Sequence, residues 1–124
     1  MTKPDIRIKR AYEPPEKGDG ARVLVDRLWP RGLRKDDAAL TLWLKEIAPS
    51  NELRQWFGHD PARWAEFVRR YRTELAHNGD AVARLGDLVN EGPVTLLYST
   101  HDGAHNNAVA LAAWLHDHWK GNRR

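Results

Sequence analysis

The sequence predicts an α/β fold: a single small domain with a mainly parallel sheet of about four strands and helices packed on it, in Rossmann-like layering. The chain has 124 residues, which is enough for one hydrophobic core and few for two. Two short runs are apolar at consecutive positions, as is typical of strands buried on both faces. Segments with helical spacing separate the candidate strands, as parallel connections require. We therefore predict one domain over residues 1–124, with residues 120–124 as a basic tail.

The first half of the chain contains three candidate strands. Residues 6–8 alternate apolar and charged side chains (IRI) and predict a short strand with one solvated face. Residues 13–20 are rich in proline and glycine (EPPEKGDG) and predict turns. Residues 22–26 are apolar on both faces (RVLVD) and predict a buried strand. Residues 39–47 fit both strand alternation and helical spacing (ALTLWLKEI), and we favour a strand.

The second half is mainly helical. Ser50 is placed to cap a short helix over NELRQWF, and Asp60 is placed to cap a longer helix that opens at Pro61. The remaining elements are a helix over residues 80–91, a buried strand over residues 94–99 and a last helix over residues 105–119. The stripe expected to face inward from the last helix consists of Ala108, Leu111, Ala112, Leu115 and Trp119.

The composition limits the chemistry that is available. Hydrophobic residues make up 41% and charged residues 30% of the chain, and the formal charge is +3, which describes an ordinary folded domain. This mildly basic charge is compatible with nucleic acid, nucleotides or acidic metabolites. The chain has no cysteine, which excludes thiol catalysis, iron–sulfur clusters and thiolate zinc sites. No segment resembles a signal peptide or a membrane span, so we expect a cytoplasmic protein with no membrane partner.

Two polar loops mark the expected site. In parallel α/β sheets, ligands bind beyond the carboxyl ends of the strands. The two buried strands end in DRLWPRG and in STHDGAHNN. The sequence lacks the G-x-G-x-x-G, Walker and G-x-S-x-G patterns, so the common dinucleotide, nucleoside triphosphate and α/β-hydrolase chemistries are not indicated and no cofactor is expected.

The first loop is suited to an anion. Arg27 and Arg31 each offer a planar fork of donors that matches phosphate or carboxylate, and Trp29 offers a face on which a ring can stack. Asp26 lies at the end of the strand. The alternative is that Asp26 pairs with one arginine and Trp29 fills core space, so that the loop is only a fixed corner.

The second loop lies between a strand and the first turn of the last helix. Its polar residues are Ser99, Thr100, His101, Asp102, His105, Asn106 and Asn107. Backbone amides at a helix N-terminus can receive an anion, but Asp102 or Asn106 can equally cap the helix. His101 and His105 have metal-ligand spacing, but the turn at Gly103 disrupts helical geometry, and we predict no metal. The other histidines, expected to be structural or solvated, are His59, His77, His116 and His118.

Three longer stretches resemble a known family. These are VLVDRLWPRG, WLKEIAPSNELRQWFGHDPARWAEFVRRY and VTLLYSTHDGAHNNAVALAAWL. The chain resembles the YeaO-like members of the DUF488 family, a bacterial domain of unknown function, from about residue 5 to residue 119. The resemblance implies a small single-domain α/β fold and no established activity. The positions that match the family motifs are Asp26, Arg27, Trp29, Pro30, Arg31, Gly32, Pro49, Ser50 and Asn106.

Our leading hypothesis is a cytoplasmic protein, enzymatic or not, that binds a phosphate-bearing, nucleotide-like ligand between the DRLWPRG loop and the start of the last helix. The candidate ligand-binding residues are Arg27, Trp29, Arg31, Ser99 and Asn106. If the protein catalyses a reaction, the candidate general acids or bases are Asp26, Asp102 and His105, because each can exchange a proton near the ligand.

Two alternatives stay open. The first is a nucleic-acid-binding or nucleic-acid-processing protein that uses the arginine-rich loop, the RRYR segment at residues 69–72 and the basic tail as phosphate contacts. The second is a non-enzymatic interaction module whose exposed tryptophans and arginines bind a protein partner.

Overall fold

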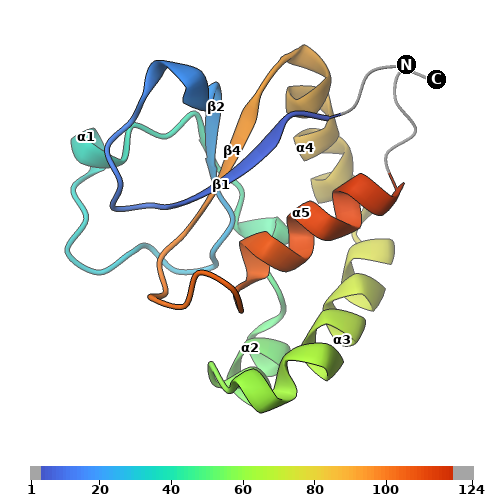
Figure 1. Ribbon diagram of the computed structural model, residues 1–124. Helices are drawn as coiled ribbons and strands as arrows, with labels where there is room; N and C mark the ends of the chain where they lie inside the picture. Colours follow the sequence, from blue (N-terminus) through green and yellow to red (C-terminus); the bar gives the residue numbers. More distant parts are fainter. Residues whose placement is uncertain (1–3, 119–124) are drawn as a thin grey trace.

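The computed structural model describes residues 4–118, in which four parallel strands form one sheet and five α-helices pack on it (Figure 1). The strands are β1 (Ile6–Arg10), β2 (Ala21–Leu24), β3 (Leu42–Trp43) and β4 (Val94–Tyr98). The helices are α1 (Lys35–Ala38), α2 (Asn51–Phe57), α3 (Trp64–Ala76), α4 (Gly79–Glu91) and α5 (Asn107–His118). The spatial order of the strands is β1-β4-β2-β3. The predicted α/β class with a parallel four-stranded sheet is therefore confirmed.

The helix starts follow from local capping. The Ser50 hydroxyl accepts a hydrogen bond from the Leu53 amide at 3.1 Å, and Asp60 Oδ1 accepts one from the Ala62 amide at 3.0 Å. Both predicted caps are confirmed. The 3₁₀ turn Pro61–Arg63 leads directly into α3.

The buried strand predicted over residues 22–26 is Ala21–Leu24, and two other predicted elements differ more from the observed ones. The strand expected over residues 39–47 is confined to Leu42–Trp43, because a 3₁₀ turn over Lys45–Ile47 follows and buries Leu44 and Ile47 together. The last helix begins at residue 107 and not at 105, because Asn106 is its cap. The predicted inward position of Trp119 and the basic tail over residues 120–124 lie outside the described residues.

The sheet has a different cover on each face. On one face, Val23, Val25 and Leu96 pack against helices α2 to α5 in the main core. On the other face, Leu24 and Leu97 pack under the segment that follows β2. Figure 1 shows α1 on the opposite side of the sheet from α3, α4 and α5. No helix within residues 4–118 is long and apolar enough to cross a membrane.

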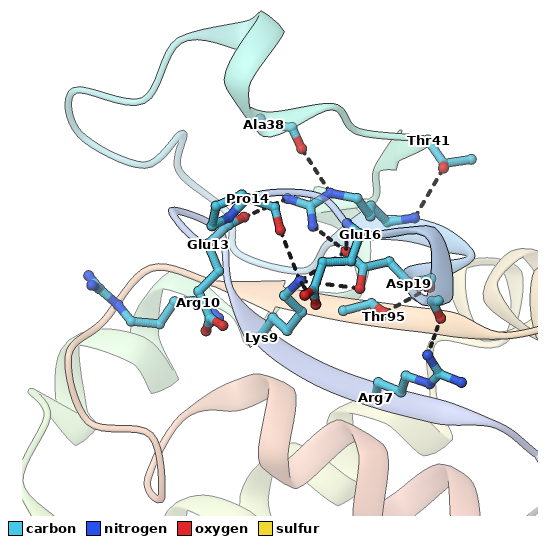
Figure 2. Close-up of polar contacts among 12 residues, drawn as sticks. Arg7, Lys9, Arg10, Glu13, Pro14, Glu16, Asp19, Ala38, Thr41 and Thr95 are labelled. Atoms are coloured by element: carbon cyan, nitrogen blue, oxygen red, sulfur yellow. Dashed lines mark hydrogen bonds and ion pairs between the residues drawn. The ribbon is translucent and has the colours of Figure 1, made fainter.

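A row of polar residues crosses the face of the sheet on which α1 lies. Arg7 on β1, Thr95 on β4 and Arg22 on β2 stand in register on three neighbouring strands. The Thr95 hydroxyl donates to the Asp19 carbonyl oxygen at 2.8 Å, and Arg22 Nη1 donates to the Asp19 carboxylate at 2.6 Å. Figure 2 shows Lys9 and Thr95 meeting Asp19. The connection between β1 and β2 is thereby fixed across the sheet.

Asp19 is the anion that holds Arg22 and Lys9. Its carboxylate also accepts hydrogen bonds from Lys9 Nζ at 3.1 Å and from the Glu16 amide at 3.1 Å. Burial by itself raises the pKa of Asp19, but the hydrogen bonds from the Glu16 amide, Lys9 and Arg22 outweigh it and hold the pKa below its ordinary value. Asp19 and Arg22 are only 4% and 3% exposed, so each buried charge requires the opposite charge beside it to offset the loss of solvation.

We predict that Asp19→Ala lowers the free energy of unfolding by about 3–5 kcal/mol, because it leaves the Arg22 guanidinium buried without its anion. Urea unfolding measures the change. Glu16→Ala is the control, because that carboxylate pairs with the same Lys9 but its side chain is 75% exposed, and it should cost about 1 kcal/mol or less. Equal losses in the two variants would contradict the assignment of Asp19 as the central anion.

Candidate functional site

The carboxyl ends of β2 and β4 lie side by side. The two strands pair in parallel, with Leu24 opposite Leu97. After β2 the chain passes to one face of the sheet, where Trp29 and Leu33 pack, whereas after β4 it enters α5 on the other face. A crevice forms where two such loops diverge, and parallel sheets bind their ligands there.

A cavity of about 390 Å³ occupies this crevice. The predicted site residues that line it are Asp26, Arg27, Trp29, Arg31, Ser99, His105 and Asn106. The structure therefore brings together two loops about 70 residues apart in the chain. Asp102 is the one predicted site residue that does not line the cavity.

Asp102 holds the turn before α5. Its Oδ1 accepts hydrogen bonds from the Ala104 and His105 amides, and its Oδ2 lies 2.9 Å from His105 Nδ1. These contacts, with the Ala104 amide foremost, hold the pKa of Asp102 below its ordinary value. The arrangement makes Asp102 a turn-forming anion that orients His105, while Nε2 of His105 is left for other contacts.

Asn106 serves chiefly as the cap of α5. Its Oδ1 accepts from the Val109 amide at 3.0 Å, its Nδ2 donates to the Asp102 carbonyl oxygen at 2.9 Å, and the residue is 3% exposed. The capping alternative is thus realised for Asn106. A ligand contact through Asn106 would have to use the second lone pair of its amide oxygen.

Asp26 forms the inner, partly buried end of the cavity. Its Oδ2 accepts hydrogen bonds from both the amide and the hydroxyl of Ser99, each at 2.9 Å. Its carboxylate thus pairs with Ser99 and not with an arginine, which ties the ends of β2 and β4 together. Burial raises the pKa of Asp26 although hydrogen bonds from Ser99 and Asn107 lower it.

Trp29 and Arg27 support the walls of the cavity. Trp29 Nε1 donates to the Leu33 carbonyl oxygen at 2.7 Å. The Trp29 ring packs edge-on against the Trp43 ring, with 5.4 Å between the ring centres. Trp29 therefore both fills the minor core and faces the cavity. Arg27 donates to the carbonyl oxygens of Ala48 and Pro49 at 3.4 and 3.3 Å, which links the β2 loop to the segment before α2.

Arg31, Arg54 and His59 form the exposed rim of the cavity. No partner of the Arg31 guanidinium lies among residues 4–118. The exposed Arg54 side chain donates one hydrogen bond, to Asn51 Oδ1 at 3.1 Å, and has no other hydrogen-bond partner among residues 4–118. Sequence reasoning missed Arg54 and His59, because α2 is far from both loops in the chain.

His59 has a left-handed backbone. Its φ is +58°, directly after Gly58 at +54°, which caps the end of α2. Left-handed backbone is disfavoured for residues with a Cβ, and strain of this kind collects at functional sites. The local signal for this position is a glycine followed by His-Asp-Pro at the end of a helix.

Arg10 and Tyr12 hold the two loops in place from outside. Arg10 donates to the carbonyl oxygens of Ser99 and Thr100 at 2.6 and 2.9 Å, and its guanidinium lies 4.6 Å from the centre of the Tyr12 ring. The Tyr12 hydroxyl donates to the Arg31 carbonyl oxygen at 2.7 Å. This bridge connects the loop after β4 to the loop after β2, and no pattern in the sequence predicts it.

Among residues 4–118, no cluster of three or more histidine, cysteine, aspartate or glutamate side chains is arranged to hold a metal ion.

We predict that His59→Gly raises the free energy of unfolding by up to about 1 kcal/mol, because glycine relieves the left-handed strain, and that it weakens anion binding at the rim. Thermal unfolding and anion titration measure the two effects. Ala39→Gly is the control, because Ala39 also has a left-handed φ, +48°, but does not line the cavity. It should stabilise the protein and leave anion binding unchanged. A loss of stability in His59→Gly would contradict the strain argument.

Comparison with known proteins gives consistent relationships. Residues 5–124 match a family model described as the inactive DUF488-N3 subclade. The uncharacterized protein YeaO of Escherichia coli (strain K12) is 48% identical over 111 residues, which cover 90% of this chain and 96% of YeaO. The uncharacterized protein Rv3073c of Mycobacterium tuberculosis (strain H37Rv) is 46% identical over 110 residues, which cover 89% of this chain and 92% of Rv3073c. No solved structure gives a match.

The resemblance to YeaO-like proteins is therefore confirmed over most of the chain. The chain belongs to the DUF488 family, in its inactive DUF488-N3 subclade.

Proposed function

We propose that this protein is a cytoplasmic binding protein for a phosphate-bearing, nucleotide-like small molecule, held in the cavity between the β2 loop and the start of α5. The observation that carries the proposal is that Arg31, Arg54 and His59, from two separate segments, meet at the exposed rim of one cavity. Guanidinium groups match phosphate oxygens in charge and in geometry.

The charge of the cavity lining supports an anionic ligand. The lining contains three arginines and one aspartate, a formal charge of +2 with both histidines neutral. Asp26, the aspartate, lies at the inner end and is engaged by Ser99, whereas Arg31 and Arg54 lie at the mouth. An anion is therefore attracted to the mouth of the cavity rather than to its inner end.

The walls suit a flat ring. Trp29, Phe57 and Phe67 line the cavity together with Pro30 and Pro49. The volume, about 390 Å³, falls in the range of small-molecule sites. A ring against these side chains and a phosphate at the rim together describe a nucleotide-like ligand.

Binding without turnover is the form of the proposal that the family favours, because the matching subclade is described as inactive. Asp102 lies outside the cavity. Asp26 and His105 do line it, and they are the acid–base candidates if turnover is found.

The RRYR segment offers less support for nucleic-acid binding. Arg69 and Arg70 both pair with Glu66, and Arg72 pairs with Asp117 at 3.0 Å. The Arg69 and Arg70 hydrogen bonds lower the pKa of Glu66 to about 2, so this carboxylate stays ionised beside them. These pairs reduce the positive charge that the face presents to a phosphate backbone.

We predict that nucleoside monophosphates raise the unfolding temperature of the protein, since a ligand at a hundredfold excess over its Kd stabilises the folded state by about 2.7 kcal/mol. Arg31→Ala should weaken binding roughly ten- to a hundredfold, because it removes a charged hydrogen-bond donor. Thermal shift with a panel of phosphate compounds, followed by calorimetry, measures both.

Arg34→Ala is the matched control. Arg34 lies in the same segment as Arg31 but does not line the cavity, so its loss should leave the Kd unchanged. Stabilisation by no phosphate compound, or an equal effect of the two substitutions, would contradict the proposal.

We further predict that the affinity for a nucleotide falls less with salt than binding to a nucleic acid would, because a single phosphate is held. Binding to a nucleic acid through several phosphates should instead fall by orders of magnitude between about 50 and 200 mM salt. Fluorescence anisotropy with a labelled oligonucleotide, run beside the nucleotide titration, separates the two partners. Tight, strongly salt-dependent oligonucleotide binding that survives Arg31→Ala would favour the nucleic-acid alternative.

A further inference from the structure

The inner end of the cavity is rich in hydrogen-bond acceptors. The Ser99 amide and hydroxyl both donate to Oδ2 of Asp26, and apart from the Asn107 amide no other side chain within residues 4–118 donates to this carboxylate. The single hydroxyl hydrogen of Ser99 is used in this contact, so Ser99 Oγ can only accept from a ligand. Asp26 and Ser99 both line the cavity, and Asp26 Oδ1, which has two lone pairs, and Ser99 Oγ can accept hydrogen bonds from a ligand.

Asn107 adds a third acceptor. Its Nδ2 donates to the Val25 carbonyl oxygen at 2.7 Å. Because a carbonyl oxygen can only accept, the amide nitrogen of Asn107 must face Val25. The amide oxygen of Asn107 therefore faces away from Val25 and can accept a hydrogen bond. The amide nitrogen carries a second hydrogen, and its contact with the Asp26 carboxylate helps to lower the pKa of that group.

The depth of these groups decides which part of a ligand they meet. Asp26, Ser99 and Asn107 are partly buried, whereas Arg31 and Arg54 at the rim are exposed. Phe57 and Phe67, which are 5% and 2% exposed, also line the cavity. A phosphate held at the rim therefore directs the ring of the ligand, and not its phosphate, toward the acceptors.

We propose that the acceptor cluster of Asp26, Ser99 and Asn107 selects nucleotides whose base carries an exocyclic amino group over those that carry a carbonyl oxygen at the same position. This inference rests on the proposed function, since it assumes that the phosphate occupies the rim. An amino group donates to Asp26 Oδ1. A carbonyl oxygen in its place would face that oxygen with no hydrogen between them, and an unpaired acceptor in a partly buried site is strongly disfavoured.

Asp26→Asn provides a sharp test, because the structure dictates how the new amide must lie. Ser99 donates twice to the Oδ2 position, so the amide oxygen must occupy it. The amide nitrogen then takes the position of Oδ1 and presents a donor where the wild type presents an acceptor. The substitution keeps the link between β2 and β4 and reverses the hydrogen-bonding character of the inner end.

Calorimetric titration with two matched pairs of nucleotides is the experiment. Cytidine and uridine monophosphates differ by an amino group against a carbonyl oxygen and, at the adjacent ring nitrogen, by an acceptor against an N–H donor. Adenosine and inosine monophosphates differ in the same two ways. We expect the wild type to bind the amino member at least tenfold more tightly in at least one pair. Asp26→Asn should reverse that preference, and Asp36→Asn, which alters an exposed carboxylate of α1 outside the cavity, should leave it unchanged.

The outcomes separate the two proposals. If the wild type binds both members of each pair within about twofold while Arg31→Ala still weakens them, the base preference is overturned and phosphate binding stands. If no nucleotide binds, both are overturned. A preference that persists in folded Asp26→Asn also overturns the role of the acceptor cluster. Cooperative thermal unfolding establishes that the variant is folded, and the wild-type comparison decides the preference even if it is not.

Discussion

The insertion of β4 between β1 and β2 is the constraint on which the rest of the structure depends. Val94 pairs with Ile6 on one side and with Ala21 on the other, so one late strand joins two early ones. Only this order places the end of β4 beside the end of β2, where the hydrogen bonds from Ser99 to Asp26 fasten the two strands. The same order puts the end of β1 on the far side of β4, from which Arg10 reaches the loop after β4. The crevice is therefore a consequence of strand order.

Buried and exposed charged side chains have different roles in this structure. On the face of the sheet that α1 shares, Arg22 and Asp19 are nearly inaccessible and satisfy one another, which is the condition under which buried charge is tolerated. At the mouth of the cavity, Arg31 and Arg54 stay exposed and find few partners among residues 4–118. Paired, buried ions fix the fold, whereas exposed cations around a cavity stay available for a ligand.

The DUF488-N3 family model matches residues 5–124, so the sheet, both loops and α2 all lie inside the matched region. A subclade described as inactive need not lose its pocket, because binding requires shape and charge but no group that turns a substrate over. At the rim of that pocket His59 has a left-handed backbone, and at its inner end burial raises the pKa of the partly buried Asp26.

The sequence by itself determined what depends on neighbours a few residues away: the parallel α/β class, the two buried strands, the caps at Ser50 and Asp60, and the polar loops at the strand ends. It placed the short strand at Leu42–Trp43 in the right region but gave it too great a length, because strand and helical spacing coincide there. Only the tertiary structure decided that Arg54 and His59 reach the cavity, that Asp102 does not, and that Arg10 and Tyr12 bridge the loops. Helix capping and the burial of one face of a helix or strand depend on residues that are close in the chain, so they leave a recognisable sequence pattern. The order of strands in a sheet is chosen by burial and pairing across the whole domain, and it leaves no local pattern.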